Sequence, residues 1–278
     1  MSKQNSQNHD KLKKIELLEK KYLNKYFHFL KFAEDELLFG FQTKEDIRTD
    51  WYGLYKSGIS NFAVGAERIV YSLLNGKGIG QPNSSPVGSD LFFEVEDAYI
   101  HIDLKTVGTT LSPIKEDKSK GINAWSDNIG DFNKGTFPGV NQNSYKGKMI
   151  VYEGTPKEEI RDYVPSLPSY YTKIKDGIKK SKICLTYFIT ILYDRDTLQI
   201  LVLCIVCMPN GELEPHYKTR VLQAGKNLDK TRFRFTDVPD FELLENNNKR
   251  IKIVYFDESM DDKYKKNLYF FEDLHNNQ

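Results

Sequence analysis

Two aspartates and a lysine between residues 90 and 105 have the types and spacing that suit metal-dependent chemistry. Asp103 and Lys105 are two positions apart in an alternating apolar run, so on a strand their side chains share one face with His101. Asp90 precedes the neighbouring apolar run and can lie across a hairpin from that face. Two carboxylates and a backbone carbonyl, such as that of Leu104, form a hard oxygen site of the kind that Mg²⁺ accepts. A lysine beside this site can orient or deprotonate a water molecule and stabilise negative charge in the transition state.

The hairpin expected to position these side chains consists of residues 91–95, a turn at Glu96-Asp97, and residues 98–107. Its second strand would direct Ile100, Ile102 and Leu104 towards a core and leave the polar face opposite. The pattern acid-x-Lys occurs four times in the chain, at residues 19–21, 103–105, 116–118 and 261–263. Only residues 103–105 lie in an alternating apolar strand with another aspartate at the head of the preceding strand, and this context singles them out.

The elements around the hairpin indicate the fold class. Apolar residues at helical spacing predict helices over residues 11–40, over 43–57 with Thr43 as N-cap, and over 60–75. Strands are expected at 183–193, 198–208, 232–236 and 250–256, a short basic helix at 169–180, a long irregular segment at 108–147 and a frayed C-terminus. Helices followed by a mainly β region predict an α+β or α/β/α domain built around one mixed sheet.

Composition narrows the class of protein further. The 278 residues carry 40 Lys+Arg and 39 Asp+Glu, so the net charge of +1 gives no global indication of a nucleic-acid partner. Aromatic residues reach 13%, which excludes wholesale disorder. The most apolar stretch, residues 183–208, is interrupted by charges and is too short to span a membrane, and the first ten residues are polar. The three cysteines form no disulfide framework, so we expect a cytoplasmic location.

The spacing of the acidic residues resembles that of a known family. Asp90, twelve intervening residues and then Asp103-Leu104-Lys105 are similar to the motif of the PD-(D/E)xK nucleases, and most similar to their type II restriction endonucleases. The helical segment at residues 63–70 resembles the first core helix of that family, and Glu67 matches its glutamate near the metal. Ser89 stands where the family often has proline. The resemblance covers about residues 60–147.

The resemblance implies Mg²⁺-dependent hydrolysis of both strands of double-stranded DNA at a specific short sequence, leaving 5′-phosphates. Asp90, Asp103 and the Leu104 carbonyl would bind the metal, Lys105 would act on the water, and Glu67 would assist. The implied fold is a restriction-endonuclease-like core with a mixed central sheet flanked by helices, in a single domain with N-terminal helices at 1–58 and a catalytic core at 59–278. The implied partners are a second copy in a homodimer and a cognate DNA methyltransferase.

DNA contacts are expected from polar loops and basic clusters. Asn and Gln can pair with adenine in the major groove, and Ser, Tyr and Lys reach phosphates; the candidates are Asn141, Gln142, Ser144, Tyr145 and Lys146. Lysines and arginines could follow the DNA backbone in two clusters, Lys173, Lys175, Lys179, Lys180 and Lys182, and Lys218, Arg220, Lys226, Lys230, Arg232 and Arg234.

Several alternatives stay open at this level. The protein could be a repair or junction-resolving nuclease of the same fold, or a non-catalytic DNA-binding protein that has the hairpin by chance. The acidic and basic residues of the hairpin could form only a cross-strand salt bridge, and His101 could be a packing residue. Cys204 and Cys207 have metal-like spacing, but a spacing of three on a strand directs them to opposite faces, which favours a core role.

Overall fold

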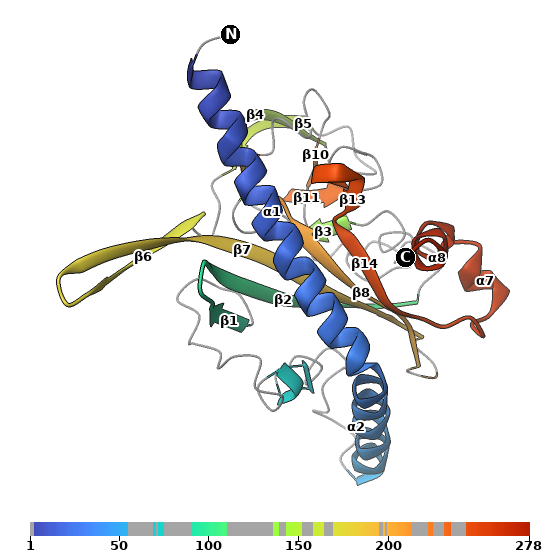
Figure 1. Cartoon of the computed structure of the whole chain (residues 1–278). Helices are drawn as coiled ribbons and strands as arrows, with labels where there is room; N and C mark the ends of the chain where they lie inside the picture. Colours follow the sequence, from blue (N-terminus) through green and yellow to red (C-terminus); the bar gives the residue numbers. More distant parts are fainter. Residues whose placement is uncertain are drawn as a thin grey trace.

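A six-stranded mixed sheet forms the centre of the computed structural model, and a long helix crosses one of its faces (Figure 1). The structure describes residues 3–54, 69–70, 72–74, 91–109, 136–138, 143–151, 158–163, 169–194, 197, 199–212, 222–224, 231–234 and 243–278. The strand order is β1-β2-β7-β8-β14, with β6 paired to β7. The bounds are β1 Leu91–Glu94, β2 Ala98–Gly108, β6 Tyr170–Lys175, β7 Ile178–Tyr193, β8 Ile200–Met208 and β14 Ile251–Phe256.

The expected hairpin is confirmed, and its second strand lies in the interior of the sheet. β1 pairs antiparallel with β2, from Leu91 opposite Ile102 to Glu94 opposite Tyr99. On its other edge β2 runs parallel to β7, with Asp103 opposite Phe188. The other strand pairs of this sheet are antiparallel. One parallel pair among antiparallel ones makes the sheet mixed, as the sequence predicts.

The sheet separates two apolar clusters. One face, the α1 face, carries Ile100, Ile102 and Leu104 together with Tyr187, and the buried side of helix α1 (Lys3–Phe32) packs on it through residues such as Leu23. The opposite face, which we call the Asp103 face, is covered at its β8–β14 end by the C-terminal helices α7 (Asp262–Lys265) and α8 (Tyr269–Asn276). The apolar residues of that second cluster include Phe188, Cys204, Val206, Ile253, Phe271 and Leu274.

The first two helices meet at a different residue from the one the sequence predicts. α1 ends at Phe32 and α2 spans Glu34–Leu54, so the break lies at Ala33 and not near Thr43. Three acidic residues, Glu34, Asp35 and Glu36, occupy the first turn of α2, where they complement the positive end of the helix dipole. Of the third expected helix, residues 69–70 and 72–74 are helical, and the rest lies outside the described residues.

The predicted basic helix at 169–180 is wrong, because this segment forms a β-hairpin. β6 pairs antiparallel with β7, and Asp176-Gly177 forms the turn between them. Both turn residues have positive φ, 52° and 75°, as a two-residue type I′ turn requires. In Figure 1 this hairpin extends well beyond the rest of the sheet. The dipeptide Asp-Gly between alternating residues was the signal for it.

A second sheet occupies part of the segment expected to be irregular. Its order is β3-β11-β10-β4-β5, with β9 paired to β4. The expectation of an irregular 108–147 is therefore wrong for residues 136–138 and 143–147. The strand expected at 232–236 is confirmed as β11. The bounds are β3 Thr136–Pro138, β4 Asn143–Val151, β5 Glu158–Tyr163, β9 Gly211–Glu212, β10 Leu222–Ala224 and β11 Thr231–Arg234. A short pair, β12 (Leu243–Leu244) with β13 (Asn248–Lys249), flanks the 3₁₀ turn Glu245–Asn247.

The expectation of a frayed C-terminus is wrong, because the C-terminal residues contact the central sheet. Phe271 and Leu274 of α8 are buried against the sheet. The side-chain oxygen of the last residue, Gln278, accepts a hydrogen bond from the backbone N–H of Ile253 at 3.0 Å. Asp261 caps α7 by accepting from the N–H of Lys263. No helix among the described residues is both long and apolar enough to cross a membrane.

Candidate active site

The centre of the candidate site is an ion pair on strand β2. The ammonium of Lys105 lies 2.6 Å from a carboxylate oxygen of Asp103, and the two residues occupy the same face, as the alternation of the strand predicts. Asp103 is 6% exposed, whereas the side chain of Lys105 keeps 33% of its surface exposed. The Lys105 ammonium also lies 5.9 Å from the ring centroid of Phe188 on β7. A buried carboxylate is thus held beside a cation that solvent can still reach.

Hydroxyl and imidazole groups surround this ion pair on the Asp103 face. Thr186 is the Cα partner of His101, and Thr190 is the Cα partner of Lys105. Both threonines and His101 are buried, and in the described part of the chain neither hydroxyl and neither ring nitrogen has a hydrogen-bond partner. Buried polar groups normally find partners. Unpartnered groups beside Asp103 fit a face that is completed by water, a metal ion or a substrate.

His101 packs as an aromatic residue in this site. Its ring centroid lies 4.9 Å from that of Phe92 on β1. Burial lowers the pKa of His101 to about 4, so the imidazole is neutral at neutral pH. These observations agree with the packing role considered for His101 from the sequence.

At the level of Asp103, strand β2 is paired on one edge only among the residues that the structure describes. β1 begins at Leu91, opposite Ile102, so beyond this point β2 has a described strand partner only on the β7 side. The predicted metal ligand Asp90 and the predicted helix residue Glu67 lie outside the described residues. Within the described residues there is no group of three or more His, Cys, Asp or Glu side chains that could hold a metal ion.

The predicted DNA-contact segment is described only in part. Asn141 and Gln142 lie outside the described residues, whereas Ser144, Tyr145 and Lys146 belong to strand β4 of the second sheet. The predicted loop is therefore a strand over these three positions. Their role in DNA contact stays a prediction.

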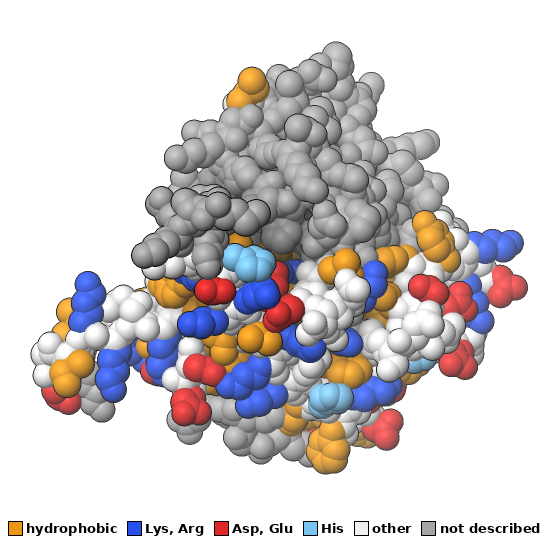
Figure 2. All heavy atoms as spheres, turned by 45° about the horizontal axis from the view of Figure 1, so that its top comes forward, with side chains coloured by type: hydrophobic (Ala, Val, Ile, Leu, Met, Phe, Trp, Pro, Cys, Tyr) orange, Lys and Arg blue, Asp and Glu red, His pale blue; other side chains and the backbone are white. Residues whose placement is uncertain are grey.

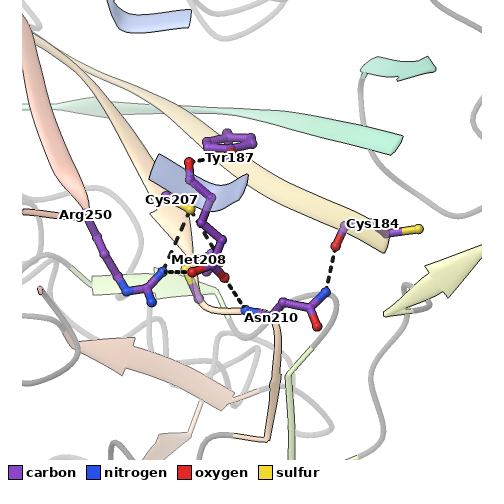
Figure 3. A network of polar contacts seen from close by, with 7 residues as sticks. Cys184, Tyr187, Cys207, Met208, Asn210 and Arg250 are labelled. Atoms are coloured by element: carbon purple, nitrogen blue, oxygen red, sulfur yellow. Dashed lines mark hydrogen bonds and ion pairs between the residues drawn. The ribbon is translucent and has the colours of Figure 1, made fainter. Parts of the chain in front are cut away.

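A buried polar network that sequence reasoning missed lies on the α1 face (Figure 3). Arg250 donates to the carboxylate of Glu19 at 3.0 Å, and both side chains are 1% exposed. The N–H of Asn210 donates to the same carboxylate at 2.7 Å, and the Tyr187 hydroxyl donates to the Glu19 carbonyl at 2.9 Å. Burial raises the pKa of Glu19, while Arg250 and the Asn210 N–H act in the opposite direction. This network joins α1 to the ends of β8 and β14 and has a structural role.

The cysteines are core residues, as the sequence predicts. Cys207 belongs to the apolar cluster on the α1 face and Cys204 to the cluster on the Asp103 face. Both are fully buried, as is Cys184. The spacing of three between Cys204 and Cys207 therefore places one cysteine in the core on each side of the sheet, and the two do not form a metal site.

Comparison with known proteins agrees with this fold and identifies the family. The chain matches the family model of the N-terminal domain of the type II restriction enzyme MwoI over residues 11–197 and that of its central domain over residues 200–256. The protein is therefore a restriction endonuclease, that is, a site-specific deoxyribonuclease of the PD-(D/E)xK type. Its mixed sheet, its flanking helices and the acidic-basic pair on a central strand fit this class. The chain is a member of the MwoI family of type II restriction enzymes.

Solved structures share the fold at low sequence identity. The restriction endonuclease BglI bound to its DNA recognition sequence has a TM-score of 0.57 and 16% identity, covering 91% of this chain and 96% of its own. Tetrameric SfiI bound to cognate DNA has a TM-score of 0.54 and 12% identity, covering 89% of this chain and 87% of its own. No curated protein sequence matches the chain significantly. The predicted restriction-endonuclease fold is thus confirmed.

Proposed function

We propose that the protein cuts both strands of duplex DNA at a specific short sequence, with Mg²⁺ as cofactor, and leaves 5′-phosphates. The observation that supports this most is the Asp103–Lys105 ion pair, in which the Asp103 carboxylate is buried and the Lys105 ammonium is accessible to solvent. The pair lies in a chain that belongs to a restriction enzyme family. Asp103 and the carbonyl of Leu104 would hold the metal ion, which lowers the pKa of a bound water. Lys105 would orient this water and stabilise charge on the phosphate.

Chain geometry supports Asp90 as the second carboxylate. Asp90 is bonded to Leu91, the Cα partner of Ile102, which in turn precedes Asp103. Consecutive Cα atoms are about 3.8 Å apart and paired strands about 5 Å, so the Cα atoms of Asp90 and Asp103 lie within about 13 Å of each other. With Mg–O distances of about 2.1 Å, two aspartate side chains share one metal ion when their Cα atoms lie within about 11 Å, a separation inside this range. Glu67 keeps its proposed assisting role on the family resemblance alone.

A single catalytic unit, with N-terminal helices at 1–58 and a core at 59–278, is also part of the proposal. The central sheet supports it, because β8 pairs along nearly its whole length with the second half of β7, across the point where the two family models meet. α1 packs on this same sheet. A homodimer would match a two-fold symmetric DNA site, and a cognate methyltransferase would protect the host's own sites.

Digestion of a plasmid of known sequence tests the activity. We expect discrete fragments with Mg²⁺, none with EDTA, and none for Asp103→Ala, which should still bind DNA in Ca²⁺. Asp261→Ala is a matched control, because Asp261 and Lys263 form the same acid-x-Lys pair, 3.5 Å apart, with both side chains exposed at the N-terminus of α7. Cutting by Asp103→Ala would refute the proposal. Smears, or a preference for branched DNA, would favour the repair or junction-resolving nuclease.

A further inference from the structure

The projecting β6–β7 hairpin has features of a binding surface. We call residues 170–182 the arm; it comprises β6, the Asp176-Gly177 turn and the first part of β7. At its base the Tyr171 ring packs edge-on against the rings of Phe92 and Tyr99, with centroids 6.2 and 5.3 Å away. Beyond this base the described side chains are exposed, including Ile174 at 74% and Ile178 at 61%. Figure 2 shows lysine and apolar side chains on the arm, at the left of the view.

The arm concentrates positive charge. Its thirteen residues contain five lysines and one aspartate, a net charge of +4, although the whole chain carries only +1. The remainder of the protein is thus net negative. Positive charge gathered on one projecting element fits a polyanion as its partner.

The register directs part of this charge to the Asp103 face. Cys184 pairs with Tyr99 on β2, which shares the face of Asp103, so Lys180 and Lys182 of β7 lie on that face as well. Lys173 lies there too, because it is the Cα partner of Lys180. The adjacent Lys179 is directed to the opposite face.

The lysines of this face are only partly neutralised. Glu94 accepts from Lys173 at 2.5 Å and from Lys182 at 3.0 Å. Lys180 is exposed and has no acidic partner among the described residues. Like charges directly opposite on paired strands, as in Lys173 and Lys180, are destabilising. An anionic partner would relieve this repulsion.

The distance along β7 between Lys180 and the Asp103 site indicates which part of a bound DNA the arm would contact. Lys180 is eight residues along β7 from Phe188, the Cα partner of Asp103. At about 3.3 Å per residue this is about 26 Å, which corresponds to about eight base pairs for DNA that lies along β7, at about 3.4 Å per base pair. We propose that the arm binds phosphates of duplex DNA about eight base pairs from the scissile bond, through the lysines of the Asp103 face. This inference rests on the proposed function.

Two adjacent lysines provide the variant and its control. Lys180→Gln removes a charge from the Asp103 face, and Lys179→Gln removes a charge, also exposed, from the other face. Fluorescence anisotropy with a mixed-sequence 40-base-pair duplex in Ca²⁺, from 50 to 200 mM salt, measures the salt dependence of binding. For Lys180→Gln we expect the slope of log K against log salt to fall by about 0.9, with affinity about five- to tenfold lower at 0.1 M salt. Lys179→Gln should bind like the wild type.

The predicted distance provides a second measurement. Once the cleavage position is mapped, a duplex that ends three base pairs from it should bind wild type and Lys180→Gln equally, because it ends before the arm. An unchanged salt slope for Lys180→Gln, or an equal loss of DNA affinity for both variants, would overturn the inference. The lysines would then serve only to protect an exposed edge strand against aggregation. A wild type that cuts no plasmid would refute the proposed function while the binding slopes stay measurable.

Discussion

Arg250 and Glu19 form a fully buried ion pair although they are 231 positions apart in the sequence. The contact ties the first helix to the residue just before β14, and the backbone of Asn210, which follows β8, binds the same carboxylate. Three distant segments therefore meet at one carboxylate beneath the sheet. Two charges taken out of water cost several kcal/mol each, so their stabilisation depends on keeping every partner in place.

Removal of one partner of this pair should destabilise the fold strongly. Arg250→Met would leave the Glu19 carboxylate buried without its cation, at a cost of about 3–5 kcal/mol. Urea unfolding followed by circular dichroism measures this loss. The double variant Glu19→Leu/Arg250→Met should recover much of it, because no buried charge remains. As a control, Lys263→Met at an exposed site should change the free energy of unfolding by no more than about 0.5 kcal/mol. A loss as small as this for Arg250→Met would contradict the prediction.

Lys105 should be needed for cleavage more than for DNA binding. Lys105→Gln removes the cation beside Asp103 and should lower the single-turnover cleavage rate by at least about 100-fold. Affinity for duplex DNA in Ca²⁺ should fall far less than the cleavage rate, by no more than the roughly five- to tenfold that the loss of one phosphate contact costs. Lys263→Gln, in the equivalent acid-x-Lys pair of α7, should cut at the normal rate. A fast Lys105→Gln enzyme would exclude Lys105 from the chemistry.

Glu94 should give the base of the arm a dependence on pH. Hydrogen bonds from Lys173 and Lys182 lower the pKa of Glu94 to about 2 from 4.5. Because the folded-state pKa is depressed, the stabilisation is complete above pH 4.5 and is lost as the pH falls towards 2. The side chain is 35% exposed, which limits the contribution to less than about 1 kcal/mol. Glu94→Gln should flatten the pH dependence of the melting temperature over this window; an unchanged profile would show that the pair contributes nothing.

Gly177 should control the order of the arm. Its φ of +75° disfavours a side chain, although no atom lies within 4 Å of a Cβ placed there. Gly177→Ala should therefore cost about 1–2 kcal/mol through backbone strain alone, and Asp176→Asn should be tolerated, since asparagine suits positive φ. Because the arm is solvated, the cost should appear as faster amide hydrogen exchange in residues 172–181 with little change in global unfolding. Equal exchange in both variants would contradict this.

The sequence predicted the parts of the fold that depend on local patterns. Strict alternation around Asp103 and Lys105 was enough to place both side chains on one face. The expected helix at 169–180 is wrong because these residues alternate on either side of the Asp176-Gly177 turn, a pattern that favours a β-hairpin. The α1–α2 break lies at Ala33 and not near the predicted Thr43, because Glu34, Asp35 and Glu36 favour a helix start directly after Ala33.

Long-range contacts could not be predicted from local patterns. Glu19 lies in an acid-x-Lys pattern like that of Asp103, yet its partner is Arg250, and nothing near Glu19 indicates that choice. Burial of Glu19 in a lysine-rich helix follows only from how α1 crosses the sheet. Likewise the direction of Lys180 towards the Asp103 face required the register between β6, β7 and β2.

Burial of all three cysteines has a practical consequence for measurement. Burial raises the pKa of Cys184 and of Cys204 to about 12, and Cys207 is shielded in the same way, so none presents a reactive thiolate at neutral pH. A cysteine introduced at the hairpin tip would be the single site open to maleimide dyes. Energy transfer from such a dye to an end-labelled DNA duplex would then report, in real time, the distance between the hairpin tip and the labelled end of the DNA.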